Sequence, residues 1–268
     1  MDYLTLNNKV KIPQLGFGTW KLKPLGEAKK ATKYALEVGY RHIDTAHIYL
    51  NEHSVGKAIA ESGIARKDIF ITTKLWNWDQ KHAHRAFDES LKKLGVEYID
   101  LYLMHYPVTE TRLQAWKDME EIYKSGRAKA IGVSNFAIRH LEQLLKNSQV
   151  VPAINQVELH PFLYQKELMG YCKSKDIAVE AYSPLVHGER MDNPVISEIA
   201  NKHKKTNAQV LLRWNLQHGN IVIPKSKTPG RIKENFEVFD FELAKEEMLK
   251  LNGLNEGLIV FWDTEKTP

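Results

Sequence analysis

The sequence predicts an α/β fold, a (β/α)8 TIM barrel whose bottom is closed by an N-terminal β-hairpin. Eight short apolar runs recur along the 268 residues, separated by charged segments whose apolar residues have helical spacing. No stretch rich in proline, glycine or serine divides the chain. Repeated strand–helix units build a parallel sheet, and eight of them close into a barrel of about 250 residues. We therefore expect residues 1–268 to form a single domain.

Each element is expected in chain order. An Asn-rich turn at 7–9 separates short apolar runs at 5–6 and 10–12, which is typical of a hairpin. Gly39, Gly95 and Gly126 follow three of the helical patterns and predict where those helices end. The barrel strands are expected at 15–19, 42–45, 69–73, 99–105, 130–134, 153–158, 178–182 and 221–224.

An open, doubly wound sheet that binds a dinucleotide at its first turn is the competing architecture. It requires the pattern G-x-G-x-x-G between the first strand and the first helix. At this place the chain has Gly16-Phe17-Gly18-Thr19-Trp20-Lys21, with lysine where the third glycine belongs. The sequence therefore favours the closed barrel.

The composition excludes several classes of protein. The single cysteine, Cys172, excludes an internal disulfide framework and a cysteine-based metal site. No apolar stretch approaches the roughly 20 residues of a membrane helix, and the N-terminus does not resemble a signal peptide. We therefore expect a cytoplasmic monomer without a membrane partner or a metal. The net charge of +5 fits either nucleic acid or a phosphorylated small molecule.

Ionisable side chains stand at the ends of three successive predicted strands. Asp44 ends the second, Lys74 follows the third, His105 ends the fourth, and Tyr49 comes five residues after Asp44. Taken singly, these residues are a helix cap, a solvated lysine, a rim histidine and a packing aromatic. The C-terminal ends of barrel strands meet at one rim, where active sites are built. Because buried charges are costly when unpaired, we expect these groups to pair with one another.

Such a group can protonate a carbonyl oxygen. Free tyrosine has a pKa of about 10, and a neighbouring ammonium is expected to lower it and make Tyr49 a usable acid. Asp44 would hold Lys74, and His105 would orient a carbonyl or share in proton transfer. Reduction of the carbonyl carbon then requires a hydride carrier.

A binding site for that hydride carrier is expected in the second half of the chain. Lys225, Ser226, Lys227 and Arg231 follow the last strand and open a helix, where barrels commonly bind phosphate. A solvated basic turn is the alternative. Hydrogen-bonding groups also end the preceding strands, and they suit either an amide-bearing ring or ordinary turns: Ser134-Asn135, Asn155-Gln156 and Tyr182-Ser183.

Taken together, these motifs resemble the aldo-keto reductase superfamily over essentially the whole chain, in particular its bacterial 2,5-diketo-D-gluconate reductase and glyoxal/methylglyoxal reductase branch. The matching stretches are Leu15-Gly16-Phe17-Gly18-Thr19-Trp20, Arg41-His42-Ile43-Asp44-Thr45-Ala46, Tyr49-Leu50-Asn51-Glu52, Thr72-Thr73-Lys74-Leu75-Trp76, Leu103-Met104-His105, Ile131-Gly132-Val133-Ser134-Asn135-Phe136, Ile223-Pro224-Lys225-Ser226 and Arg231-Ile232-Lys233-Glu234-Asn235.

The resemblance implies an NADP(H)-dependent carbonyl reductase of the alcohol dehydrogenase type. Its catalytic residues would be Asp44, Tyr49, Lys74 and His105, with Tyr49 as general acid. Its substrates would be aldehydes and ketones, namely small dicarbonyls, keto sugars or keto acids. NADPH would lie extended across the rim without a Rossmann fold.

The resemblance also implies the binding residues. The cofactor would contact Gly18, Thr19, Trp20 and Asp44, with Ser134, Asn135 and Gln156 at its carboxamide, Tyr182 under its nicotinamide, Ser183 and Leu185 along its pyrophosphate, Lys225, Ser226, Lys227 and Arg231 at its 2′-phosphate and adenine, and Glu234 and Asn235 at the adenine edge. The substrate would contact Trp20, Tyr49, Trp76, His105 and Tyr106. Family members often carry tryptophan where Tyr106 stands, and the tail at 257–268 departs from their pattern.

Two other classes of function remain as alternatives. Seven histidines suggest a metal-dependent barrel hydrolase, namely His42, His47, His53, His82, His84, His105 and His160. The H-x-H of such enzymes is missing from the first strand, however, and His82-Ala83-His84 falls in a helical segment. The positive charge suggests a nucleic-acid-binding or redox-sensing module. Its basic residues are scattered along helices rather than gathered in a stripe, so we expect no nucleic-acid partner.

Overall fold

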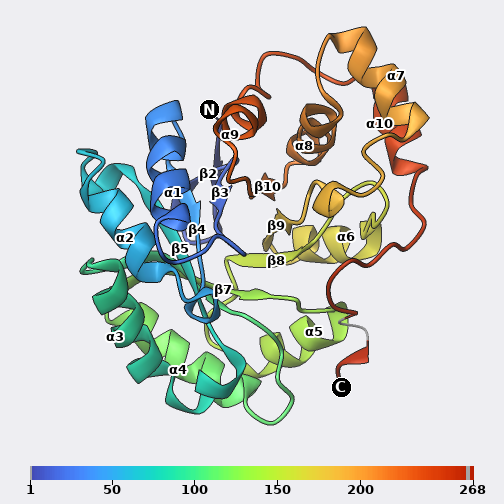
Figure 1. Cartoon of the computed structure of the whole chain (residues 1–268). Coiled ribbons are helices and arrows are strands. Elements are labelled where there is room, and N and C mark those ends of the chain that lie inside the picture. Colours follow the sequence, from blue (N-terminus) through green and yellow to red (C-terminus); the bar gives the residue numbers. More distant parts are fainter. Residues whose placement is uncertain (1, 264–265) are drawn as a thin grey trace.

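The computed structural model describes residues 2–263 and 266–268, and it shows a barrel of parallel strands surrounded by helices (Figure 1). Neighbouring strands follow the chain order, and hydrogen bonds between the last strand and the residues that lead into the first one close the barrel: Val222 N donates to Gln14 O, and Gly16 N donates to Val222 O, both at 2.8 Å. The predicted (β/α)8 fold is therefore confirmed. The barrel strands are β3 (Phe17–Gly18), β4 (His42–Asp44), β5 (Phe70–Leu75), β6 (Ile99–Met104), β7 (Ala128–Ser134), β8 (Ile154–Glu158), β9 (Ala178–Tyr182) and β10 (Ile221–Val222).

The helices cover the outside of the barrel and bury one face each. In the third helix, Ala83, Ala86, Phe87 and Leu94 face the core, and Gly95 ends it at φ 67°, a left-handed conformation that suits glycine. The α-helices are α1 (Glu27–Val38), α2 (Glu52–Ala60), α3 (Ala83–Leu94), α4 (Arg112–Lys124), α5 (Ile138–Asn147), α6 (Lys166–Ser174), α7 (Pro194–His203), α8 (Asn207–Gln217), α9 (Pro229–Phe236) and α10 (Lys245–Asn252). Short 3-10 turns lie at η1 (His47–Tyr49), η2 (Arg66–Asp68), η3 (Asn77–His82) and η4 (Val186–Gly188).

The predicted hairpin closes the bottom of the barrel. Strands β1 (Tyr3–Thr5) and β2 (Lys11–Pro13) pair in the antiparallel sense. Leu6 and Ile12 are buried in an apolar cluster with residues from the barrel floor, among them Phe70, Leu101 and Ile154. This apolar contact fixes the hairpin and leaves the opposite rim for a site.

Several strand bounds differ from those predicted. β5 continues through Leu75, so Lys74 lies inside the strand and its side chain is enclosed by the barrel. β10 has two residues, because Pro224 has no N–H to continue the ladder. Among the described residues, no helix is long and apolar enough to cross a bilayer.

Candidate active site

A cavity of about 1130 Å³ opens at the C-terminal ends of the strands. It reaches from Trp76 and Trp262 at one end to Asn207 and Glu234 at the other. This volume exceeds the range of roughly 300–1,000 Å³ that is usual for small-molecule sites. The cavity is therefore large enough for an extended ligand together with a small one.

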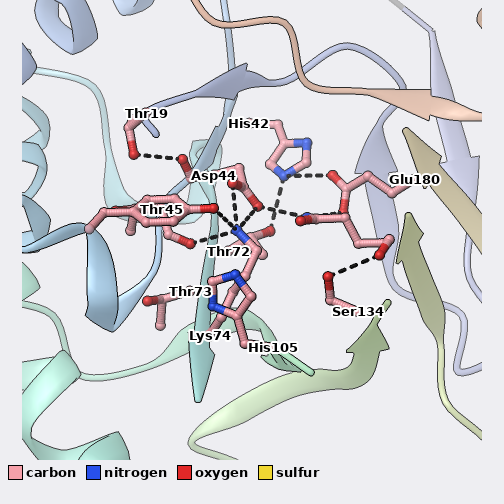
Figure 2. A network of polar contacts seen from close by, with 12 residues as sticks. Thr19, His42, Asp44, Thr45, Thr72, Thr73, Lys74, His105, Ser134 and Glu180 are labelled. Atoms are coloured by element: carbon pink, nitrogen blue, oxygen red, sulfur yellow. Dashed lines mark hydrogen bonds and ion pairs between the residues drawn. The ribbon is translucent and has the colours of Figure 1, made fainter. Parts of the chain in front are cut away.

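Lys74 is held by several oxygen atoms just beneath the cavity (Figure 2). Its Nζ donates to Asp44 Oδ1 at 2.6 Å and Oδ2 at 2.8 Å, and to Thr45 O at 2.9 Å. The Tyr49 hydroxyl lies 3.5 Å from the same nitrogen. The strands explain this geometry, because β4 pairs with β5 in parallel and sends Asp44 and Lys74 toward the same end. The buried ammonium is thus balanced by a carboxylate and remains in contact with the phenol.

The pKa of Tyr49 is shifted in the direction opposite to the one predicted. Although part of the ring faces the cavity, desolvation of the hydroxyl raises this pKa well above its ordinary value, and Asp44 and Glu180 raise it further. The prediction that Lys74 lowers the pKa of Tyr49 is therefore wrong for the protein without bound ligands. Spacing along the chain does not show how far the surrounding protein excludes water from a hydroxyl.

His105 lies beside Tyr49 with its ring in an aromatic setting. Its centroid is 5.8 Å from Tyr49 and 4.9 Å from Trp76, and both contacts are edge-to-face. Burial, together with Lys74, lowers the pKa of His105 well below its ordinary value. The imidazole is therefore neutral at physiological pH and can give one N–H hydrogen bond to a carbonyl oxygen.

A second layer of polar residues lies below Asp44, and the sequence reasoning missed two of its members. Gln156 Nε2 donates to Asp44 Oδ2 at 2.8 Å and to Glu180 Oε2 at 3.0 Å. His42 Nε2 lies 3.0 Å from Thr72 Oγ1 and 3.6 Å from Glu180 Oε1. The missed residues are Glu180 and His42. For Glu180 the available signal was a charged residue in the middle of an apolar strand, which is rare unless the residue is paired. For His42 it was the alternation along the strand, which puts residues 42 and 44 on the same face.

The ends of β7, β8 and β9 are joined by side-chain hydrogen bonds. Ser134 Oγ donates to Gln156 O at 2.9 Å, and Asn135 Nδ2 donates to His105 O at 2.9 Å. Tyr182 donates its hydroxyl to Asn135 Oδ1 at 2.8 Å. Asn135 has φ 65°, a conformation that asparagine tolerates better than most residues. These contacts hold four of the predicted cofactor residues together along one side of the cavity.

Cations and helix N-termini gather at the far end of the cavity. Lys225, Lys227 and Arg231 all line it, and α9 begins there at Pro229. Lys227 Nζ also lies 3.6 Å from Glu27 Oε2 on α1. Because the first N–H groups of a helix have no partner within the helix, this end is suited to a phosphate group.

Aromatic side chains form the wall near Tyr49. Trp20 and Trp76 line the cavity, as the sequence predicted, and the C-terminal tail contributes Phe261 and Trp262 to the same wall. Phe261 is 4.5 Å from Trp20, centroid to centroid. The tail is held because Glu158 accepts hydrogen bonds from the N–H groups of Val260 at 2.9 Å and Phe261 at 3.0 Å. The sequence predicted Trp20 and Trp76, whereas the aromatic residues of the divergent tail were the only sign of the part that Phe261 and Trp262 add.

Most of the predicted site residues line this one cavity. Thr19, Lys74 and Tyr106 do not: Thr19 donates its hydroxyl to Asp44 O, Lys74 lies below, and Tyr106 stands against Trp262 at 5.4 Å. Those that line it are Gly18, Trp20, Asp44, Tyr49, Trp76, His105, Ser134, Asn135, Gln156, Tyr182, Ser183, Leu185, Lys225, Ser226, Lys227, Arg231, Glu234 and Asn235. Lining residues that the sequence reasoning missed include Lys21, Ile48, His187, Met191, Thr206, Asn207, Phe261 and Trp262.

The histidines do not form a metal centre in the part of the chain that the structure describes. There, no three His, Cys, Asp or Glu side chains are placed to hold an ion together. His84, on the outer surface of α3, lies 3.2 Å from Glu121.

Comparison with known proteins places this geometry in one family. The model of the aldo/keto reductase family matches residues 14–256. The glyoxal reductase of Bacillus subtilis is 49% identical over 257 residues, which cover 95% of this chain and 93% of that protein. The methylglyoxal reductase DkgA of Salmonella typhimurium is 49% identical over 250 residues, covering 92% and 90%. The crystal structure of an aldo-keto reductase from Bombyx mori in complex with NADP superposes with a TM-score of 0.92 at 38% identity, covering 98% and 96%.

Proposed function

Because the chain belongs to the aldo/keto reductase family, we propose that it is an NADPH-dependent oxidoreductase that reduces aldehydes and ketones to alcohols, with Tyr49 as the proton donor. The family assignment and the reductase relatives establish carbonyl reduction as the class of reaction. One observation carries the assignment of the proton donor. The Lys74 ammonium, held by Asp44, lies 3.5 Å from the Tyr49 hydroxyl at the floor of the cavity.

The residues around the cavity fit NADPH. The cations Lys225, Lys227 and Arg231 would hold its 2′-phosphate, and Tyr182 offers an aromatic face to its nicotinamide. Once bound, the reduced nicotinamide supplies the hydride. The remaining contacts would come from Gly18, Trp20, Asp44, Ser134, Asn135, Gln156, Ser183, Leu185, Ser226, Glu234 and Asn235. Thr19, which is fully buried and does not line the cavity, would support Asp44 instead of touching the cofactor.

Tyr49 would donate its proton to the oxygen of the reduced carbonyl. Its raised pKa keeps the hydroxyl protonated over the physiological range. An alkoxide is a stronger base than a phenolate, so the transfer is downhill once negative charge develops on the substrate oxygen. Lys74 then stabilises the phenolate that remains, and Asp44 keeps the ammonium in place. The neutral His105 would orient the carbonyl.

Small dicarbonyls, keto sugars and keto acids remain the proposed substrates. The names of the glyoxal and methylglyoxal reductases among the relatives support the first of these. Trp20 and Trp76 would contact the substrate directly, and Tyr106 would act through Trp262. We keep the single domain over residues 1–268, the cytoplasmic location and the monomeric state as predictions.

The test is the variant Tyr49→Phe. We expect kcat for methylglyoxal to fall by about 10²- to 10⁴-fold, the usual contribution of a positioned acid. The Kd for NADPH, measured by calorimetry, should change less than about twofold because the ring is retained. Tyr171→Phe, on the outer helix α6, is the matched control and should keep full activity. Turnover retained by Tyr49→Phe would refute the proton-donor role.

A further inference from the structure

Glu180 is a buried carboxyl group that the proposed chemistry leaves unused. It lies at the middle of β9, two residues before Tyr182, and has no exposed surface. Its Oε2 accepts the hydrogen bond from Gln156 Nε2. Its Oε1 has no hydrogen-bond partner among the described residues and lies 3.6 Å from His42 Nε2 (Figure 2). Such a group is costly as a carboxylate.

The charges around Glu180 do not balance if every acid is ionised. The polar side chains that face Glu180 are His42 and Asp44 on β4, Lys74 on β5 and Gln156 on β8. On β10, the residue in register with Glu180 is the apolar Ile221. Burial, together with Lys74, lowers the pKa of His42 to about 3, so Lys74 is the only cation of this group at neutral pH.

Burial raises the pKa of Asp44 above its ordinary value, although its contacts with Lys74 and Gln156 oppose that shift. Of the two acids, Asp44 alone touches the ammonium, so it is the acid that keeps its charge. Burial, together with Asp44, raises the pKa of Glu180 to about 8. At neutral pH Glu180 therefore carries a proton.

Gln156 links Glu180 to the catalytic group. Its amide nitrogen contacts both carboxyls, which leaves the amide oxygen as the atom that can bind a ligand in the cavity that Gln156 lines. With Glu180 neutral, the Asp44 carboxylate is the only anion on that nitrogen. With Glu180 ionised, two anions compete for one amide group and one ammonium, and the added negative charge holds the Tyr49 proton more tightly.

We propose that Glu180 is a positioning residue of this active site, which through Gln156 keeps Asp44 on Lys74 and which, on losing its proton, slows proton donation by Tyr49. The proposal rests on the proposed reductase function. It assigns Glu180 no contact with the substrate.

The first test compares the pH dependence of kcat in the wild type and in Glu180→Gln. Wild-type kcat for reduction should fall about tenfold from pH 7 to pH 9, because the active form carries a proton on Glu180. Glu180→Gln cannot titrate and should keep a flat profile over this range. Glu120→Gln alters another buried carboxyl, whose partners are the backbone N–H groups of Gln149 and Val150, and it should retain the wild-type fall. A fall that persists unchanged in Glu180→Gln would overturn the proposal.

The second test separates positioning from folding. Glu180→Ala should lower kcat at pH 7 at least tenfold, and Glu180→Gln should recover most of it because glutamine can still accept from Gln156. If Glu180→Ala does not fold, the comparison of wild type with Glu180→Gln still decides the matter. Equal losses of kcat in both variants would show that the side chain's shape and hydrogen bond do not matter, against the proposal.

A third measurement does not need turnover. The infrared band of a protonated carboxyl should disappear with a midpoint near pH 8 in the wild type and be absent in Glu180→Gln. No such band at pH 7 would contradict the protonated state of Glu180. If the wild type reduced no carbonyl at all, the proposed function would be refuted. If the wild type and Glu180→Gln both turned over with identical pH profiles, only the role of Glu180 would be refuted.

Discussion

Individual side chains at this site take their properties from their neighbours. Lys74 and Glu180 are both enclosed by the barrel, yet Lys74 touches a carboxylate, whereas Glu180 touches no cation among the residues that the structure describes. The first is therefore held as a charged group and the second as a neutral one. Arg231 is the opposite case, since it is exposed at the start of α9 and is free to meet a charged ligand.

At this scale we expect Arg231→Ala to raise KM for NADPH by about 10- to 100-fold, the effect of losing one charge-assisted hydrogen bond. KM for NADH, which has no 2′-phosphate, should change less than about twofold. The measurement is initial-rate kinetics with each cofactor. Lys233→Ala, on the same helix and 3.9 Å from Glu237, is the control and should leave both KM values unchanged. Equal increases for the two cofactors would remove Arg231 from the 2′-phosphate site.

The residues that the sequence predicted share one property. Asp44, Lys74 and His105 stand where an apolar run ends, a place where a core would not choose a charge. Glu180 could not be assigned from the sequence because it lies within a strand, and only the register of the barrel places it near Asp44. His42 lies two residues before Asp44 on the same strand, but the pattern does not show that it packs beside Glu180. The pKa of Tyr49 was misjudged for a similar reason, since it depends on how water is excluded by several elements at once.

At the scale of elements, the tail is the segment whose contribution the sequence did not reveal. Its aromatics meet side chains from several places in the chain, among them Trp20 near β3, Trp76 after β5 and Tyr182 in β9. Such contacts cannot be predicted from local patterns. Element bounds were also less certain than element types, as the extension of β5 past Lys74 shows.

We expect Glu158→Gln to loosen the tail, because the amide can accept from Val260 and Phe261 less well than the carboxylate does. KM for an aromatic aldehyde should rise about fivefold, the equivalent of one hydrogen bond of about 1 kcal/mol. KM for methylglyoxal, which is too small to use the whole wall, should change less than twofold.

Limited chymotrypsin digestion gives an independent measure of that variant and should cleave the tail faster than in the wild type. Glu167→Gln, an exposed substitution on α6, is the matched control. Unchanged digestion and unchanged KM would show that Glu158 does not hold this wall.

At the scale of the molecule, stability and pH are linked through the barrel interior. The pKa of Glu180 is raised from its ordinary 4.5 to about 8 in the folded protein. The stability from this group is therefore complete below pH 4.5 and is lost as the pH rises to about 8. We therefore expect the free energy of unfolding of Glu180→Gln minus that of the wild type to increase from pH 5 to pH 8, because only the wild type loses this contribution. Urea denaturation at both pH values checks this, and a constant difference would contradict it.

The fold itself was the most predictable property, because alternating strand and helix patterns recur along the entire chain. Closure of the barrel was inferred from the number of these units, and hydrogen bonds between its last strand and the residues that lead into the first one now account for it. The lengths of those two strands could not be predicted, since they depend on how the ends of the sheet meet.

The hairpin packs against the lower end of the barrel and closes it. Leu6 and Ile12 fill that end, so a ligand can reach Tyr49 only from the rim at the opposite end and must leave by the same way. A reductant and a carbonyl compound would therefore both enter and leave across the same rim, since the packed floor of the barrel offers them no second route.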